Sequence, residues 1–130
     1  MTKFNEKTYA GAIEALHNAE QTDEFAADDA KFIEDFMNDC SSYVQRVNEM
    51  ETSLKLSRFH LDADAYKEKI SALDSSRRAL HNGIIANLRM LERMMAQYKL
   101  PSFFTGDVED RHQVADFCGE VSKYIYQNRQ

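Results

Sequence analysis

Apolar side chains recur along the chain at intervals of three and four residues, which is the spacing of one face of an α-helix. The pattern predicts four helices, over residues 5–20, 27–58, 65–99 and 108–127. The long apolar faces of the second and third helices consist of Phe32, Ile33, Phe36, Met37, Cys40, Tyr43, Val44, Val47, Met50 and Leu54, and of Tyr66, Ile70, Leu73, Leu80, Ile84, Leu88, Leu91, Met95 and Tyr98. We therefore expect an all-α protein, a four-helix bundle that forms one domain over residues 1–130.

Acidic residues at the ends of these segments predict where the helices begin. Asp28 and Asp29 fall in the first turn of the second helix, where the helix dipole favours negative charge. Asp62 or Asp64 is a suitable N-cap for the third helix, because a short carboxylate can accept a hydrogen bond from the first turn. Asp107 is expected to cap the fourth helix in the same way.

Three short motifs bear on the continuity of the two long helices. Ser41-Ser42 marks a candidate bend, because hydroxyl groups compete for backbone carbonyls. Asn82-Gly83 is typical of a turn, but the apolar period continues in phase across it, and we predict one helix there. Pro101 ends that helix. The connection that follows should fold Phe103 and Phe104 back over the core.

The lengths of the predicted helices constrain how they can pack. The second and third helices exceed 30 residues each, about 50 Å at a rise of 1.5 Å per residue. A short turn joins them, so they should form an antiparallel hairpin. The first and fourth helices both connect at the open end of this hairpin. If both fold back, they cover only its open half, and residues 48–76 project as a two-stranded coiled tip.

An uncovered tip would expose apolar side chains, and exposed apolar patches usually mark association. We therefore predict that the tip binds a protein partner or a second copy of the chain, which would form a homodimer. Two alternatives would remove this surface: a bend of the second helix near Ser41, or outer helices that splay to cover the tip. The predicted interaction surface consists of Met50, Leu54, Phe59, Leu61, Tyr66, Ile70 and Leu73.

Charge is distributed unevenly over the 130 residues, and the formal net charge is −6. Residues 1–64 carry 6 Lys and Arg against 14 Asp and Glu, whereas residues 65–130 carry 10 against 8. An acidic protein has no general attraction for phosphate backbones or anionic membranes. Bulk binding to nucleic acid or to a membrane surface is therefore disfavoured.

The cellular compartment is predicted from what the chain lacks. It has no run of about 18 apolar residues that would span a membrane, and its N-terminal region lacks the apolar segment of a signal peptide. Cys40 and Cys118 fall on apolar helix faces, and we expect buried free thiols rather than a disulfide framework. These features predict a cytoplasmic protein.

Two Glu-x-x-His pairs are candidate metal ligands, namely Glu14 with His17 and Glu109 with His112. Di-iron bundle proteins use two such pairs plus one Glu from each of two other helices. His112, however, falls off the buried face of its helix, so we expect no metal site and no cofactor. The residues that would complete the ligand set are Glu34 or Glu49 and Glu68 or Glu92.

A basic stretch runs along the predicted third helix from Arg77 to Arg93. Arginine, asparagine and histidine on one helix can recognise nucleic acid. The stretch lies beside an acidic second helix, so an intramolecular salt-bridge face is the preferred interpretation.

A series of spaced residues in the C-terminal part carries a resemblance. The series is Arg78-x-x-His81-Asn82-x-x-Ile85, Leu88-x-x-Leu91-x-Arg93, Leu100-Pro101-x-Phe103, Gly106-Asp107, Asp110-Arg111 and Val114-Ala115-Asp116-Phe117. Residues 77–129 resemble a family of small helical proteins of unknown function from Gram-positive bacteria, often associated with prophages or other mobile elements. The resemblance implies a bacterial accessory protein and no particular activity. On their own chemistry, His81 and Asn82 should hydrogen-bond to the cap of the last helix, and Arg111 should pair with Glu92 or Glu109.

No nucleophile paired with a base and no glycine-rich phosphate loop occurs in the sequence. We therefore expect no enzyme and no catalytic residues. The leading hypothesis is a non-enzymatic helical protein–protein interaction or accessory protein of bacterial or prophage origin. One alternative is a nucleic-acid-associated regulator that uses the Arg77–Arg93 face. The other is a metal-binding bundle protein that uses the two Glu-x-x-His pairs.

Overall fold

The computed structural model describes residues 2–128, and its helices lie where the apolar period predicts. α1 spans Glu6–Ala19, α2 spans Ala26–Ser57, α3 spans Ala63–Gln97 and α4 spans Arg111–Gln127. Within the described residues, extended structure is confined to one isolated bridge between Phe4 and Phe104. The all-α fold is thus confirmed, and each boundary lies within three residues of its predicted place.

Side-chain caps fix the starts of α1 and α3. Asn5 Oδ1 accepts a hydrogen bond from the Thr8 N–H at 3.1 Å. Asp62 Oδ1 accepts one from the Ala65 N–H at 2.8 Å. Each bond satisfies one of the backbone donors that a helix start leaves without an intrahelical partner. Of the two aspartates proposed for α3, Asp62 is therefore the cap.

α4 begins three residues later than predicted, because Asp110 and not Asp107 caps it. Asp110 Oδ1 accepts hydrogen bonds from the backbone N–H groups of Gln113 and His112. These bonds favour the ionised carboxylate, and they lower the pKa of Asp110. Asp107 instead closes a tight turn before the helix, where its Oδ1 accepts from the Glu109 N–H at 2.9 Å.

Both long helices run through the motifs that could have interrupted them. The Ser41-Ser42 pair lies inside α2, and Ser41 Oγ is 3.3 Å from Ser122 Oγ on α4. Asn82-Gly83 lies inside α3, as the continuous period predicts. α3 ends at Gln97, ahead of Pro101. The hairpin therefore has two uninterrupted arms.

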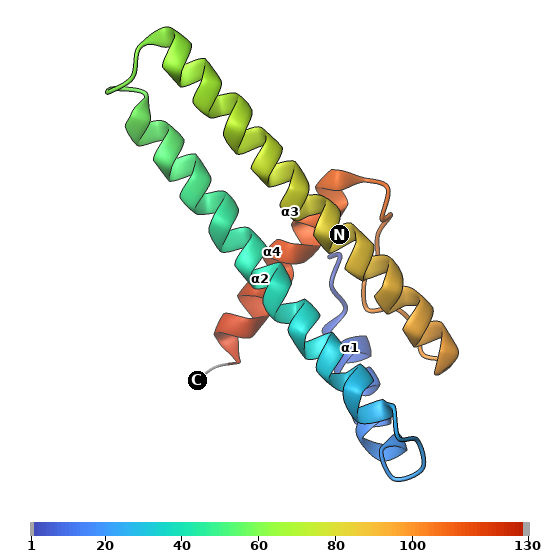
Figure 1. Cartoon of the computed structure of the whole chain (residues 1–130). Helices are drawn as coiled ribbons and strands as arrows, with labels where there is room; N and C mark the ends of the chain where they lie inside the picture. The colour runs from blue at the N-terminus through green and yellow to red at the C-terminus, as the bar shows by residue number, and fades with distance from the viewer. Residues whose placement is uncertain (1, 129–130) are drawn as a thin grey trace.

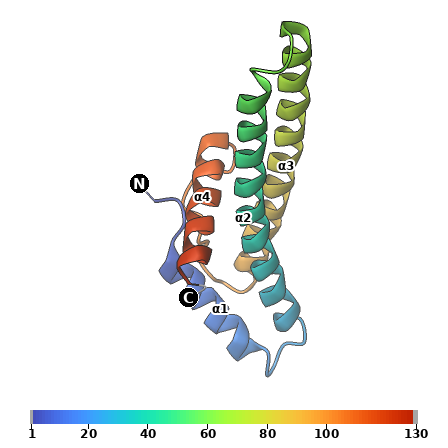
Figure 2. The same ribbon diagram turned by 90° about the vertical axis from the view of Figure 1, so that its left-hand side faces the viewer.

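α2 is the centre of the fold and packs against α1, α3 and α4. α2 and α3 form a long antiparallel hairpin, and α1 and α4 lie against its open half only (Figure 1). The view turned by 90° shows the other half extending alone beyond α4 (Figure 2). Burial agrees, because α2 has no buried residue after Tyr43 and α3 has none before His81. We call the projecting half, residues 48–76, the hairpin tip.

An aromatic cluster fills the core of the open half. Phe117 on α4 is fully buried, and its ring centroid lies 5.1 Å from that of Phe104 and 5.8 Å from that of Phe4. Phe103 is also fully buried. The prediction that Phe103 and Phe104 fold back over the core is confirmed.

The N-terminal segment is held against α4 and the α3–α4 connection. Glu120 on α4 accepts hydrogen bonds from the backbone N–H groups of Lys3, at 2.9 Å, and Phe4, at 3.3 Å. The Thr105 N–H donates to the Lys3 carbonyl at 2.8 Å, beside the Phe4–Phe104 bridge. Residues from three distant parts of the chain are thereby joined at one edge of the core.

Cys40 and Cys118 are fully buried free thiols, as predicted. Burial raises the pKa of the Cys40 thiol, and the neighbouring Cys118 raises it further. A thiol that stays protonated is a poor nucleophile. The two side chains therefore act as small apolar groups where α2 meets α4.

Candidate functional site

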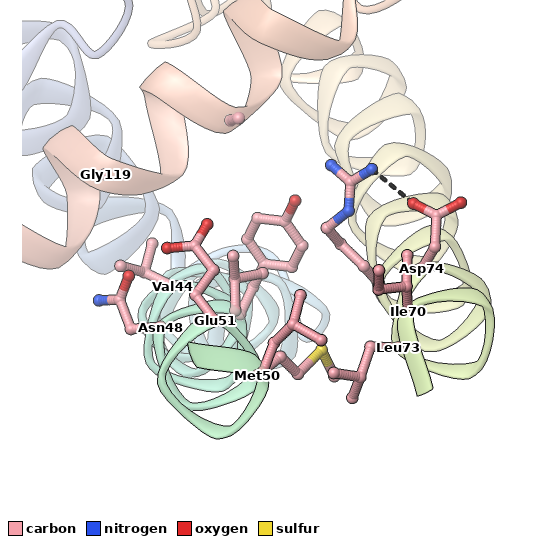
Figure 3. A pocket seen from close by; sticks show the side chains of 13 residues that line it. Val44, Asn48, Met50, Glu51, Ile70, Leu73, Asp74 and Gly119 are labelled. Atoms are coloured by element: carbon pink, nitrogen blue, oxygen red, sulfur yellow. Dashed lines mark hydrogen bonds and ion pairs between the residues drawn. The ribbon is translucent and has the colours of Figure 1, made fainter. Parts of the chain in front are cut away.

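A groove of about 460 Å³ runs along the hairpin tip between α2 and α3 and ends against α4. In Figure 3, Met50 from α2 and Leu73 from α3 point toward one another between the two helices. Gly119 on α4 faces the same space from its inner end. The groove is thus bounded by three helices and remains open toward the end of the tip.

Four of the seven predicted surface residues line this groove, namely Met50, Leu54, Ile70 and Leu73. Phe59 and Leu61 lie in the turn that closes the hairpin, with 83% and 39% of their surface exposed. Tyr66 is half-buried and does not line the groove. The structure therefore divides the predicted surface into a groove and an apolar end.

The predicted interaction surface did not include the residues at the inner end of the groove. This end is lined by Val44 and Val47 from α2 and by Ala115 and Gly119 from α4. The two valines belong to the apolar face of α2, but the place where α4 stops covering that face depends on how the helices cross. Leu56, which is 63% exposed, was also missed and lies beside Thr52 and Ser53 on another side of α2.

Charged side chains border the groove on its α3 side. Arg77 donates to Asp74 Oδ1 at 2.8 Å, and Arg78 Nε lies 3.2 Å from Asp74 Oδ2. The hydrogen bond from Arg77 lowers the pKa of Asp74, and the positive charge of Arg78 lowers it further. This carboxylate therefore stays ionised and links two successive arginines of α3.

His81 lies next to this cluster and is 6% exposed. Its Nδ1 is 3.2 Å from the Tyr43 hydroxyl on α2. The expectation that His81 and Asn82 bond to the cap of α4 is wrong, because α2 supplies the partner of His81 and Asn82 is exposed. The expected pairing of Arg111 with a glutamate is also wrong, since Glu109 pairs with Arg89 and the ion pairs among residues 2–128 do not include Arg111. Arg111 instead lines a cavity beside His81.

The two Glu-x-x-His pairs are not brought together. His17 Nδ1 lies 3.3 Å from Glu20, on the same helix. Glu109 pairs with Arg89, and His112 sits in the first turn of α4. Within residues 2–128, no three His, Cys, Asp or Glu side chains are placed to hold a metal ion. The described residues thus do not provide the donor set that a di-iron bundle requires.

Three arginines of the basic stretch of α3 are paired with carboxylates. Arg77 and Arg78 share Asp74, and Arg89 pairs with Glu109 from the α3–α4 connection. These partners are acidic residues of the same chain, but they lie on α3 itself and on the α3–α4 connection and not on the acidic second helix.

None of the helices in the described part of the chain is both long enough and apolar enough to cross a membrane. A search of the curated proteins finds no match to this chain. Residues 2–130 match the family described as Protein of unknown function (DUF3232). The match covers the whole helical fold, so a resemblance limited to residues 77–129 was too short. The chain therefore belongs to the family described as Protein of unknown function (DUF3232).

Proposed function

We propose that the protein is a non-enzymatic helical interaction protein whose hairpin tip binds a second copy of the same chain. The observation that carries this proposal is the uncovered apolar groove of the tip. Half-buried or exposed Met50, Leu54, Ile70 and Leu73 line it, and a largely exposed Phe59 lies in the turn that closes the hairpin. Exposed apolar surface of this kind is typical of association sites.

The exposed area supports an occupant of substantial size. A compact monomer of 15.0 kDa exposes about 7,000 Å². This chain exposes 8666 Å², an excess of roughly 1,600 Å² over the compact value. A standard interface buries about 800 Å² on each partner. The excess follows from the elongated shape, and it is larger than the area that one partner of such an interface buries.

The charges of α2 are complementary in an antiparallel arrangement of two tips. Glu49 and Glu51 lie near the base of the tip, and Lys55 and Arg58 lie near its end. If two grooves face each other across a two-fold axis perpendicular to the hairpin, α2 of one copy lies antiparallel to α2 of the other. The basic end of each α2 then lies over the acidic base of its counterpart.

The charges of α3 show the reverse order and support the same arrangement. Asp62 and Asp64 lie at the end of the tip, and Arg77 and Arg78 lie at its base. The same two-fold axis places the acidic end of each α3 over the basic base of the other. Complementary charges of this kind fix the register of an interface more than its strength. A two-fold axis along the hairpin would instead place α2 of one copy over α3 of the other, and these charges would again be complementary. The charge pattern therefore favours the pairing of two tips, and cross-linking between copies distinguishes the two arrangements.

The proposed dimer is a four-helix assembly made from two hairpins. Its centre would be formed by the groove residues of both copies, with the Phe59 side chain of each copy directed toward the inner end of the other groove. Membership of an uncharacterised family is consistent with an accessory role. The bacterial or prophage origin and the cytoplasmic location belong to the same proposal. Two free thiols suit a reducing compartment.

Light scattering across a concentration series tests the proposal on the intact chain. The wild type is expected to have twice the monomer mass of 15.0 kDa. Leu54→Asp/Ile70→Asp places two carboxylates in the groove and should give a folded monomer, because burying unpaired charges is costly.

The matched control is Phe25→Asp/Met90→Asp. These side chains are 61% and 50% exposed and lie outside the tip, so the same two charges are added elsewhere. The control should remain a dimer, and circular dichroism should show helical protein in all three cases. A wild type that stays monomeric across the series would overturn the proposal, as would a control that dissociates as readily as the groove variant.

A further inference from the structure

A second cavity, of about 230 Å³, lies beside the groove at the start of α4. Three helices contribute to it, and its polar lining is dominated by nitrogen donors. The residues that line it are Tyr43, Arg77, Arg78, His81, Arg111, His112 and Ala115.

His81 brings a buried donor to this cavity. The Nε2 atom of His81 is buried and has no hydrogen-bond partner among the described residues. Burial, followed by the charges of Arg111 and Arg77, lowers the pKa of His81, so its ring is neutral near neutral pH. The Tyr43 hydroxyl lies 3.2 Å from the ring atom Nδ1, and either of the two atoms can be the donor. When Tyr43 donates, the proton of the neutral ring is on Nε2, the buried atom without a partner, and an anion in the cavity favours this tautomer.

Positive charge exceeds negative charge around the cavity. Arg77 and Arg78 share the single carboxylate of Asp74. The guanidinium of Arg111 makes no ion pair or hydrogen bond with any residue in the range 2–128. Three guanidinium groups line the cavity and no carboxylate does, and the negative charges that act on Arg77 are those of Asp74 and Glu51. Positive charge is therefore in excess at the cavity. A partly enclosed site of this kind attracts anions more strongly than an exposed surface does.

We infer that this cavity binds a small dianionic oxyanion, such as a phosphate or sulfate group. Guanidinium groups match the oxygen geometry of such anions and donate two hydrogen bonds at a time. The Nε2–H of His81 supplies a further donor from the buried side. The ligand would satisfy the unpartnered nitrogen and balance the excess positive charge together.

The size of the cavity limits the ligand. Pockets for drug-sized molecules measure about 300–1,000 Å³, and this cavity is smaller. It can enclose one oxyanion group, whereas the organic part of a larger molecule would have to lie outside. The site adjoins the proposed dimer interface, because Arg77 borders both cavities and Arg77 and Arg78 also lie at the base of that interface.

Nuclear magnetic resonance on the full chain tests the inference with inorganic phosphate as the probe and sulfate as a second dianion. Sodium chloride keeps the ionic strength constant, because screening alone shifts charged groups. Phosphate should produce a saturable shift of the His81 Nε2 resonance, and sulfate should do the same. Arg111→Gln should weaken phosphate binding by at least about tenfold, since it removes a charged donor.

Arg93→Gln is the matched control, because it makes the same substitution on α3 outside the cavity. It should leave the dissociation constant unchanged. Arg111 is exposed, so its substitution should not unfold the chain. The inference is wrong if phosphate produces no saturable shift at His81, or if both variants lose affinity equally.

Discussion

At the residue scale, Lys99 is the position where the chain departs from relaxed backbone geometry. It has a φ of 58° and is the only residue other than glycine with a positive φ among residues 2–128. The Leu100 N–H donates to the Met95 carbonyl at 2.9 Å, and the Lys99 N–H donates to the Ala96 carbonyl at 3.0 Å. This pair of bonds is a Schellman motif, in which the left-handed position is usually glycine.

Lys99→Gly is therefore expected to stabilise the protein. The left-handed conformation costs an L-residue about 1–2 kcal/mol. Glycine removes that cost, but its more flexible unfolded state offsets part of the gain in the free energy of unfolding. The net increase should be roughly 0.5–1 kcal/mol. Urea unfolding would measure the change. Lys99→Ala is the control and should not exceed the wild type, and a Lys99→Gly protein less stable than Lys99→Ala would refute this account of the C-cap.

Single residues also mark the limit of prediction from the sequence. Both predicted cysteines are buried, because their burial follows from the helical period, and both predicted phenylalanines are buried, because they lie in the short apolar connection after Pro101. The partners of His81 and Arg111 were predicted wrongly, because they depend on which residues of α2 face α3 and α4. A cap was placed at Asp107 rather than Asp110 because either carboxylate suits the start of a helix.

At the element scale, the positions of the helices and the pairing of α2 with α3 can be predicted from local properties of the sequence. The position of the N-terminal segment that Glu120 holds, residues 2–5, cannot, and we call this segment the strap. A helical face of ten apolar residues and a short turn are sufficient to predict the α2–α3 hairpin and its projecting half. Glu120, by contrast, contacts backbone groups more than 110 positions away in the chain. No periodic pattern in the sequence signals a carboxylate that binds a segment without secondary structure.

Glu120→Ala should release this strap while leaving the helices in place. Hydrogen bonds to a charged group contribute about 1.5–3 kcal/mol each, so the strap should open at least about tenfold more often. Hydrogen exchange at the Thr105 N–H, which donates to the Lys3 carbonyl, would report it.

The control for this experiment is Asp116→Ala, an exposed carboxylate on the same helix. Exchange at Thr105 should stay at the wild-type rate in this variant. Amides in the middle of α2 should be unaffected in both proteins. An unchanged rate at Thr105 in Glu120→Ala would mean that other contacts, such as burial of Phe4, hold the strap by themselves.

At the scale of the whole molecule, the arrangement follows from helix length. Two helices of 32 and 35 residues are paired with outer helices of 14 and 17, so the outer pair covers half of the hairpin. The sequence was therefore sufficient to predict the projecting tip and four residues of its groove. The sequence was not sufficient to predict the residues at the inner end of the groove, because these depend on where α4 crosses α2.

The central claim is that two tips meet groove to groove, with α2 antiparallel to α2. The two-fold axis would then pass near the middle of the tip, where Leu54 of one copy lies close to Leu54 of the other. Leu56 is two residues further along the same helix but lies on another side of it. Leu56 is 63% exposed and Leu54 is half-buried. Random collisions would therefore favour disulfide formation by a cysteine at position 56 over one at position 54.

Disulfide formation between copies of Leu54→Cys, compared with Leu56→Cys, is the most direct measurement of that claim. The native thiols of Cys40 and Cys118 are buried and should not compete under mild oxidation. We predict that Leu54→Cys forms a covalent dimer faster than Leu56→Cys, despite its lower exposure. Equal or faster dimer formation by Leu56→Cys would contradict the proposed interface.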